Sequence, residues 1–338
     1  MHISFSCVNE DKPGEKWKAL FDRTWPHYKT WFLSEGYFAR KGYVSSAGEL
    51  NDHMPELFSL YKNLVGLAGG GDLEARFLSM YCPPAYMSGC SQVAWTQNST
   101  SLIRNYDYSF KMFEGMLLKT NWLQPVIGVS DCTWGLLDGM NASGLAASLT
   151  FGGRKITGDG FGIPIIIRYI LETSKNVKEG LAILKRVPVH MAYNVTMIDS
   201  SGAFVTVYLS PDRPAMIVNS AVATNHQEEL EWGDYATLTD TIERKRHLER
   251  LVSSNEETET SMIGHFLQPP LYSTNFEKAF GTLYTILYKV EKGKVEIHWP
   301  ERMVKQSFSE FKEELIVPFS LAQGRDIYLQ SFKIDLSN

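Results

Sequence analysis

The sequence has no excess of positive charge. Its 33 Lys and Arg residues are outnumbered by 38 Asp and Glu residues, which gives a formal net charge of -5 and a pI near 5.9. Proteins that bind a nucleic-acid backbone or an anionic membrane surface usually carry basic patches. We therefore expect neither nucleic acid nor membrane as a partner.

The chain also lacks long hydrophobic runs. No stretch approaches the roughly eighteen consecutive apolar residues that a membrane helix needs. The opening residues, MHISFSCVNEDKPGEKW, show neither the positive start nor the apolar core of a signal peptide. These absences predict a soluble, cytoplasmic protein, and they leave its oligomeric state open, a homo-oligomer included.

Cysteine is scarce, and no metal-binding pattern is present. The four cysteines show no CxxC spacing, and the eight histidines include no HxxxH or HExxH pair. A reducing cytosol would keep the cysteines as thiols. We expect no metal ion, no cofactor, and packing roles for Cys82 and Cys132.

Two kinds of hydrophobic pattern divide the chain. Apolar residues at helical spacing cover 15–33, 47–68 and 71–81, and again 163–186 and 237–254. From residue 90 onward the remaining segments alternate and are rich in β-branched and aromatic residues, as strands are. Helices thus precede and interrupt a chain that otherwise consists of strands.

Cys90 follows Ser88 and Gly89 at the start of the first predicted strand. A thiol is a good nucleophile only as its thiolate, so a base must take the proton, and no histidine lies near Cys90 in the sequence. The cysteine's own α-amine, with a reference pKa of about 7.7 to 8.0, is a base only after the Gly89–Cys90 bond has been cut. Glycine would permit the strained backbone in which the sulfur attacks the Gly89 carbonyl. The alternative is an unreactive, buried cysteine.

Five strings of the sequence resemble the N-terminal-nucleophile hydrolases, in the branch of isopenicillin N acyltransferase-like autoproteolytic enzymes. Penicillin V acylases and bile salt hydrolases are more distantly similar. The strings occur in the family's order and are GCSQVAW at 89–95, RNYDYS at 104–109, DGMNASGLAASLTFGG at 138–153, ATNHQ at 223–227 and GTLYTILY at 281–288.

The resemblance implies an α+β fold, a four-layer αββα sandwich of two antiparallel sheets between helical layers. Residues 1–89 would then be a helical pro-segment or small subunit that packs on the core. Residues 90–338 would be the catalytic domain.

The resemblance also implies roles at the start of this domain. Cys90 would be the nucleophile, and its α-amine the base after autocleavage between Gly89 and Cys90. Asp107 would orient that amine or the thiol, while Arg104 would favour the thiolate and order Asp107. An ideal strand places residues three positions apart on opposite faces, so we expect a bulge or twist near Tyr106 to bring both to the site.

Three further residues have implied roles. Asn225 aligns with the family's oxyanion-hole asparagine, a donor to the charge that develops during acyl transfer. Thr150 stands where bile salt hydrolases have asparagine, so its hydroxyl or a backbone N–H would replace that second donor. A further cation is expected near the site, and Arg244 is preferred over Arg246 and Lys278.

The implied activity is hydrolysis or transfer of the acyl group of a linear amide through a Cys90 thioester. The substrate would be a small acyl-amide, with an amine or an acyl-thioester as a co-substrate. Two alternatives stay open: an uncleaved thiol hydrolase that pairs Cys90 with His226, and a non-catalytic ligand-binding protein on the same fold. The acyl and amine groups themselves are not indicated by the sequence.

Overall fold

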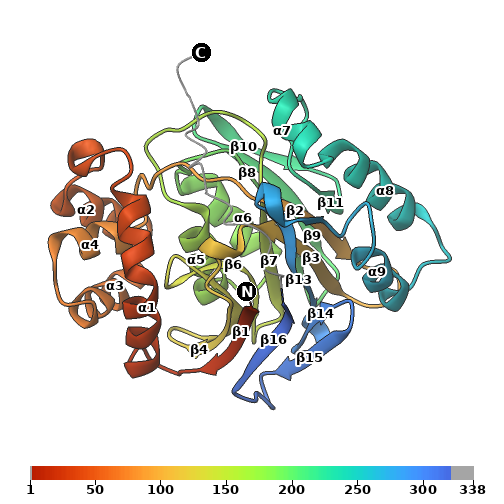
Figure 1. Cartoon of the computed structure of the whole chain (residues 1–338), viewed down its shortest axis with the longest axis horizontal. Helices are drawn as coiled ribbons and strands as arrows, with labels where there is room; N and C mark the ends of the chain where they lie inside the picture. Colours follow the sequence, from red (N-terminus) through yellow and green to blue (C-terminus); the bar gives the residue numbers. More distant parts are fainter. Residues whose placement is uncertain (1, 321–338) are drawn as a thin grey trace.

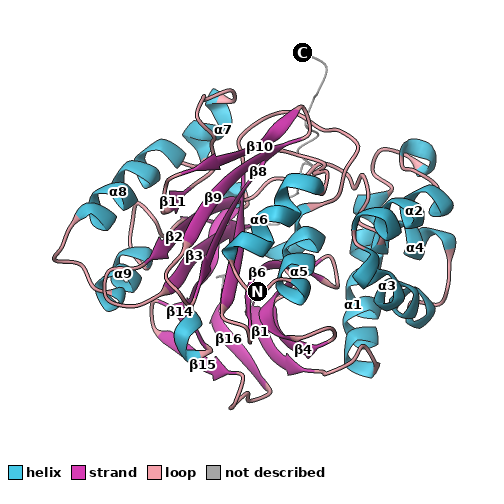
Figure 2. Cartoon of the chain, turned by 180° about the vertical axis from the view of Figure 1, so that it is seen from behind, coloured by secondary structure: helices cyan, strands magenta, loops and turns pink. Residues whose placement is uncertain are grey.

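The computed structural model consists of four stacked layers: helices, a nine-stranded sheet, a seven-stranded sheet and helices again (Figures 1 and 2). It describes residues 2–320, so residue 1 and the end of the predicted catalytic domain, 321–338, lie outside the described residues. The predicted α+β sandwich is confirmed.

The nine-stranded sheet has the order β10-β9-β8-β7-β6-β5-β4-β1-β16, and all neighbours are antiparallel except β1 and β4. Its first strand in the chain, β1, belongs to the segment 1–89 that was expected to be helical. That segment is therefore tied into the same sheet as the strands that follow Cys90. The strands are β1 (His2–Asn9), β4 (Met116–Asn121), β5 (Pro125–Asp131), β6 (Gly135–Asn141), β7 (Leu145–Phe151), β8 (Tyr193–Asp199), β9 (Phe204–Ser210), β10 (Arg213–Val218) and β16 (Glu314–Ser320).

The seven-stranded sheet has the order β11-β2-β3-β13-β14-β15, with β12 paired to β13, and is antiparallel throughout. Strand β2, which carries Cys90, lies between β11 and β3. Its strands are β2 (Gly89–Trp95), β3 (Ser101–Tyr108), β11 (Val222–Ala223), β12 (Thr274–Asn275), β13 (Phe280–Lys289), β14 (Lys294–Trp299) and β15 (Arg302–Ser307).

Two groups of helices cover the outer faces of the sheets. Helices α5 and α6 pack on the nine-stranded sheet, with α1 to α4 beyond them at one end of the molecule, while α8 and α9 pack on the seven-stranded sheet (Figure 1). The helices are α1 (Glu15–Phe32), α2 (Tyr43–His53), α3 (Pro55–Leu67), α4 (Asp72–Leu78), α5 (Ile163–Thr173), α6 (Val177–Arg186), α7 (Gly233–Leu238), α8 (Thr241–Ser253) and α9 (Glu259–Phe266). Short 3₁₀ turns occupy Tyr37–Ala39, Phe110–Met112, Phe276–Lys278 and Val290–Lys292. Among the described helices, none is long and apolar enough to cross a bilayer.

Three predicted helices are interrupted or shortened for local reasons. The segment 47–68 breaks before Pro55, because proline cannot donate the backbone hydrogen bond that a continuing helix needs. The segment 163–186 breaks after Thr173, and the Asn176 side chain accepts a hydrogen bond from the Glu179 N–H to start α6. The segment 237–254 becomes helical again at Thr241, after Asp240 adopts a left-handed backbone conformation with φ of 48°.

The hydrophobic core lies in the three spaces between the four layers. One cluster joins the nine-stranded sheet to helices α1 to α6. A second fills the space between the sheets, and a third lies between the seven-stranded sheet and helices α8 and α9. Burial on both faces explains why β2 and β3 have hardly any exposed residue. The site around Cys90 is therefore built on rigid, enclosed strands.

Candidate active site

Cys90 is the second residue of β2, and its side chain is fully buried in the core between the two sheets. Its sulfur lies 3.2 Å from Nη2 of Arg104 and 3.6 Å from the hydroxyl of Ser88. Burial raises the pKa of the Cys90 thiol, and the positive charge of Arg104 opposes that rise. The thiol therefore sits beside a cation that stabilises its ionised form.

Arg104, in β3, projects into the space between the sheets. Its guanidinium forms a buried ion pair with Asp138 of β6 and donates to the hydroxyl of Tyr284 at 2.9 Å. The Asp138 carboxylate also accepts hydrogen bonds from the hydroxyls of Tyr284 and Tyr288, each at 2.6 Å. Asp138 was not singled out in the sequence, although it opens the string at 138–153. A buried arginine requires a buried counter-charge, and this requirement could have pointed to an acidic residue such as Asp138 as the partner of Arg104.

Asp107 lies on the other face of β3, toward helix α8. Its carboxylate pairs with Nη1 of Arg244 at 3.2 Å and accepts a hydrogen bond from the Thr282 hydroxyl at 2.6 Å. Burial raises the pKa of Asp107, and the Arg244 charge counteracts part of this. The bulge expected near Tyr106 is absent from the pairing of β3 with β2, and the irregularity lies instead in the partner strand β13, between Thr282 and Tyr284, opposite Asp107 and Tyr106. It leaves Arg104 and Asp107 on opposite faces, so Arg104 does not order Asp107 directly.

Arg244, the residue preferred as the further cation, is buried and contacts several groups of the site. Its guanidinium donates to the backbone carbonyl of Cys90, to Oδ1 of Asn225 and to the carbonyl of Thr239, each at 2.7 Å. The rivals Arg246 and Lys278 are exposed. Arg244 belongs to a buried stripe on α8 that also contains Thr241, Leu248 and Leu251, which explains how a helix rich in charges brings one of them inward.

Asn225 spans the backbone around Gly89. Its Oδ1 accepts a hydrogen bond from the Cys90 N–H at 2.8 Å, and its Nδ2 donates to the carbonyl of Ser88 at 2.9 Å. Because the Cys90 N–H and Arg244 both donate to the same end of the Asn225 amide, that end is the oxygen and the other end, Nδ2, is the donor. Asn225 is thus held against the bond that is predicted to be cut.

Thr150 and His226 have other partners. The Thr150 hydroxyl donates to the Thr224 carbonyl at 2.6 Å, so it supports the backbone beside Asn225 and is not free to donate to a substrate. The Nδ1 atom of His226 lies 2.9 Å from the Thr241 hydroxyl. Burial, followed by the charge of Lys245, lowers the pKa of His226 to about 4. These hydrogen bonds direct neither side chain to the Cys90 sulfur.

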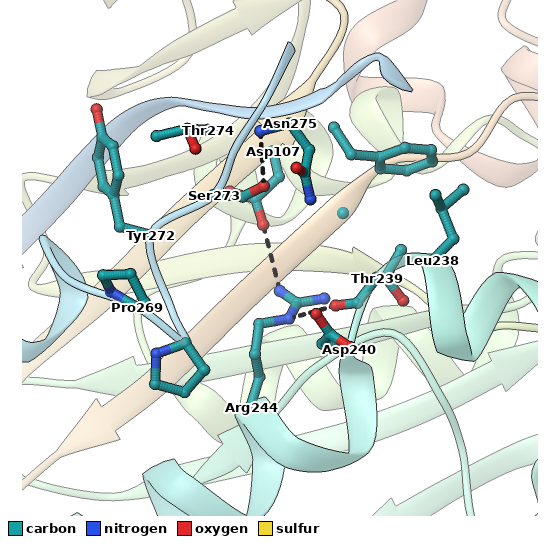
Figure 3. Close-up of a pocket in the computed structure, with 13 residues that line it drawn as sticks. Asp107, Leu238, Thr239, Asp240, Arg244, Pro269, Tyr272, Ser273, Thr274 and Asn275 are labelled. Atoms are coloured by element: carbon teal, nitrogen blue, oxygen red, sulfur yellow. Dashed lines mark hydrogen bonds and ion pairs between the residues drawn. The ribbon is translucent and has the colours of Figure 1, made fainter. Parts of the chain in front are cut away.

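A cavity of about 200 Å³ lies beside Gly89, on the Asp107 side of the sheet (Figure 3). Figure 3 shows Arg244 reaching from α8 across the cavity to Asp107. Burial, followed by the nearby Asp107 charge, raises the pKa of Tyr272, another lining residue, to about 12. The wall also contains Leu238, Thr239, Asp240, Pro269, Pro270, Ser273, Thr274, Asn275 and Phe280. The cavity therefore offers mostly polar groups next to the Gly89–Cys90 bond.

A family model matches residues 95–303, well over half of the chain, and describes the acyl-coenzyme A:6-aminopenicillanic acid acyl-transferase family. The chain belongs to this family. The resemblance drawn from the five sequence strings is thereby confirmed. Arg104, Asp107, Asn225 and Arg244 lie within the part that matches the acyl-transferase family, and Cys90 lies five residues before it.

Three solved structures show weaker likeness, each with 14% identity. Penicillin V acylase from Agrobacterium tumefaciens has a TM-score of 0.47 and covers 65% of this chain and 86% of its own. A mutant of conjugated bile acid hydrolase from Clostridium perfringens has a TM-score of 0.44, over 69% and 97%. A Caenorhabditis elegans ortholog of N-acylethanolamine-hydrolyzing acid amidase has a TM-score of 0.43, over 68% and 99%. No curated protein matches the chain.

Within residues 2–320, no three His, Cys, Asp or Glu side chains form a group that could hold a metal ion. The groups around Cys90 are a thiol, two guanidinium groups, a carboxylate and an amide. This set suits nucleophilic acyl chemistry.

Proposed function

We propose that the chain is a cysteine hydrolase or acyltransferase of linear amides that first cuts itself between Gly89 and Cys90. The setting of Cys90 supports this most: Asn225 holds its N–H, Arg104 lies against its sulfur, and a glycine precedes it. Family membership supports the same class of reaction, because the family is described by acyl transfer. Asp107 and Arg244 are assigned supporting roles because Arg244 donates to the Cys90 carbonyl and forms an ion pair with Asp107.

Autocleavage begins when the Cys90 sulfur attacks the carbonyl carbon of Gly89. The carbon–sulfur bond forms as the Gly89–Cys90 carbon–nitrogen bond breaks, and the proton lost by the thiol ends on the departing nitrogen. Gly89 thus becomes a thioester and the Cys90 nitrogen becomes a primary amine. Water then opens the thioester and leaves Gly89 as a carboxylate. Arg104 favours the attacking thiolate, and Asn225 holds the departing nitrogen through the 2.8 Å hydrogen bond.

After the cut, Cys90 supplies both nucleophile and base. Its α-amine takes the thiol proton, the sulfur attacks the acyl carbon of the substrate, and the proton passes to the departing amine. Water or a second amine then accepts the acyl group from the thioester. Asp107, which packs directly against Gly89, is placed to accept a hydrogen bond from the new ammonium group.

The substrate we propose is a small acyl-amide, with an amine or an acyl-thioester as co-substrate in the transfer reaction. The cavity beside Gly89 has room for part of such a molecule. Water exclusion from this space would decide between hydrolysis and transfer. A panel of N-acyl amino acids, acylated lactones, penicillins and bile conjugates, each offered with and without an added amine, would identify the acyl and amine groups.

N-terminal sequencing and intact mass measurement test the proposal directly. Active, freshly purified protein should contain fragments that correspond to residues 1–89 and 90–338, with Cys90 as a new N-terminus. An uncut chain that turns over an amide would contradict the scheme, because Cys90 would then have no α-amine. An uncut and inactive chain would instead favour the ligand-binding alternative.

Autocleavage should accelerate with rising pH. Burial raises the pKa of Cys90 in the uncut chain, so the thiolate is a minor species at neutral pH, and its fraction rises about tenfold per pH unit below that pKa. The rate of fragment formation should rise accordingly between pH 6 and 8, as followed by denaturing gel electrophoresis of freshly refolded protein. A rate that is flat or falls over this range would show that thiolate formation does not limit the cut.

Gly89→Ala should slow autocleavage by about tenfold. A Cβ atom at this position would lie 2.9 Å from the Cβ of Asp107 and 3.3 Å from the ring of Phe280. Displacing these groups is expected to add about 1–3 kcal/mol to the barrier for the cut. An increase of about 1.4 kcal/mol in a barrier lowers the rate by a factor of about ten. Gly89 has no positive φ in the uncut chain, so in this state it is the lack of space that favours glycine at residue 89.

The control for Gly89→Ala is Gly48→Ala, whose added methyl group would meet no atom within 4 Å. Both variants are followed by the appearance of the 90–338 fragment. Equal rates for the two variants would show that the close packing of Gly89 on Asp107 has no part in the cut.

A further inference from the structure

The carbonyl oxygen of Ser88 accepts two hydrogen bonds in the uncut chain. The Nδ2 atom of Asn225 donates to it at 2.9 Å and the hydroxyl of Tyr235 donates to it at 2.7 Å. Two donors that converge on one carbonyl oxygen form the arrangement that stabilises an oxyanion in acyl transfer. Ser88 lies two residues before Cys90, so this pair of donors is adjacent to the nucleophile.

Both donors are held in place by contacts that do not involve Ser88. The Asn225 amide is oriented by the Cys90 N–H and by Arg244, which bind its oxygen at 2.8 and 2.7 Å. The Tyr235 ring is buried and packs against Phe151, with 5.2 Å between ring centroids, and against Trp232, with 5.1 Å. Donors fixed in this way need no rearrangement when charge develops on the oxygen between them.

The Tyr235 hydroxyl remains a donor at working pH. Burial, with the nearby Cys90 sulfur as the second cause, raises the pKa of Tyr235 well above its usual value. The hydroxyl of Thr150, by contrast, is committed to the Thr224 carbonyl. Of these two hydroxyls, only that of Tyr235 points to an oxygen beside Cys90.

We propose that Tyr235 is a catalytic residue, whose hydroxyl forms the oxyanion hole of the cut enzyme together with Nδ2 of Asn225. In the uncut chain the Ser88 carbonyl occupies this hole. Autocleavage frees the segment that ends at Gly89, and its departure leaves both donors open to a substrate. This inference rests on the proposed function, because it assumes that Cys90 attacks an amide.

The chemical step is the acylation of Cys90. As the Cys90 sulfur bonds to the acyl carbon, the electron pair of the carbonyl double bond moves to its oxygen, and the α-amine holds the thiol proton. Tyr235 and Asn225 donate to that oxygen until the carbonyl re-forms and the carbon–nitrogen bond breaks. The leaving amine takes the proton from the α-ammonium, so no other reactant is needed.

Tyr235→Phe tests the role, because it keeps the ring and removes only the hydroxyl. Loss of one oxyanion-hole donor lowers kcat by about 10²-fold or more, with KM changed little. The assay uses the best amide from the substrate panel on protein whose cut at Cys90 has been verified by mass. Tyr61→Phe is the matched control, since it removes a buried hydroxyl that donates to the Ala75 carbonyl at 2.8 Å in the layer of α1 to α4. Its kcat should stay at the wild-type value.

An unchanged kcat in the cut Tyr235→Phe protein would overturn the assignment and leave the proposed function intact. The proposed function fails separately, if wild-type protein lacks the Cys90 N-terminus or if a variant without the thiol is active. Should Tyr235→Phe fold poorly or stay uncut, wild-type cut enzyme can be crystallised with the aldehyde analogue of the preferred acyl group. The oxygen of the thiohemiacetal should lie within about 3.2 Å of both donors, and an oxygen beyond reach of the Tyr235 hydroxyl would also overturn the assignment.

Discussion

Cys90→Ala is expected to give one uncut chain with no measurable acylase activity. The variant lacks the sulfur that must attack both the Gly89 carbonyl and the substrate. Removal of a catalytic nucleophile lowers kcat by about 10⁶-fold in comparable hydrolases, and here the missing cut also removes the base. A denaturing gel and an amide hydrolysis assay on the same preparation measure both effects.

A second cysteine provides the control for this variant. Cys7 is also buried in the cluster between the sheets, but it lies in β1. Cys7→Ala should be cut and active, so a defect confined to Cys90→Ala cannot come from loss of a buried thiol as such. Full activity in Cys90→Ala would refute the nucleophile assignment.

Cys90→Ser separates the two reactions that the thiol is proposed to perform. Its hydroxyl can still attack the adjacent Gly89 carbonyl, which is held in place by the chain itself, so slow cutting should persist. Turnover of a free amide should fall further, because a hydroxyl is ionised far less than a thiol at the same pH and gains less from Arg104.

The sequence was sufficient for the parts of the fold that depend on local pattern. Alternation predicted strands such as β3 and β8, and helical spacing predicted α1 and α5, because each residue's face is set by its own element. It did not predict that β1 pairs with β4 and β16, since those partners are distant in the chain and their pairing depends on how the layers close. The sequence therefore did not predict that residues 2–9, in a segment expected to be helical, form a strand of the nine-stranded sheet.

The site shows the same division. Cys90 and Asn225 were selected from the sequence strings and Arg244 as the expected further cation, and the structure brings all three together around the backbone of Cys90. Tyr235 was not selected, because its position depends on ring packing between segments that no motif connects. The hydroxyl of Thr150, selected as a donor to the substrate, donates to the Thr224 carbonyl in the structure, a contact that depends on the packing of two distant segments.

Arg104→Met is expected to lower both the stability and the activity of the protein, for two separable reasons. The fully buried Asp138 would lose its counter-charge, which costs about 3–5 kcal/mol for an unpaired buried charge. The Cys90 sulfur would also lose the cation 3.2 Å away that favours its thiolate. The free energy of unfolding in urea and the rate of fragment formation measure the two losses.

The double variant Arg104→Met, Asp138→Asn separates the loss of stability from the loss of activity. A neutral amide at residue 138 can still bond to the Tyr284 and Tyr288 hydroxyls, so the double variant should recover most of the lost stability. It should not recover the cut or turnover, because no cation returns to the sulfur. Asp138→Asn alone, which keeps Arg104 but removes its counter-charge, should be destabilised and still cut. If the double variant regained wild-type rates along with stability, Arg104 would act only as the partner of Asp138. The thiolate would then need another cation, and Arg244, which donates to the Cys90 carbonyl and opposes the rise that burial causes in the pKa of the thiol, is the candidate.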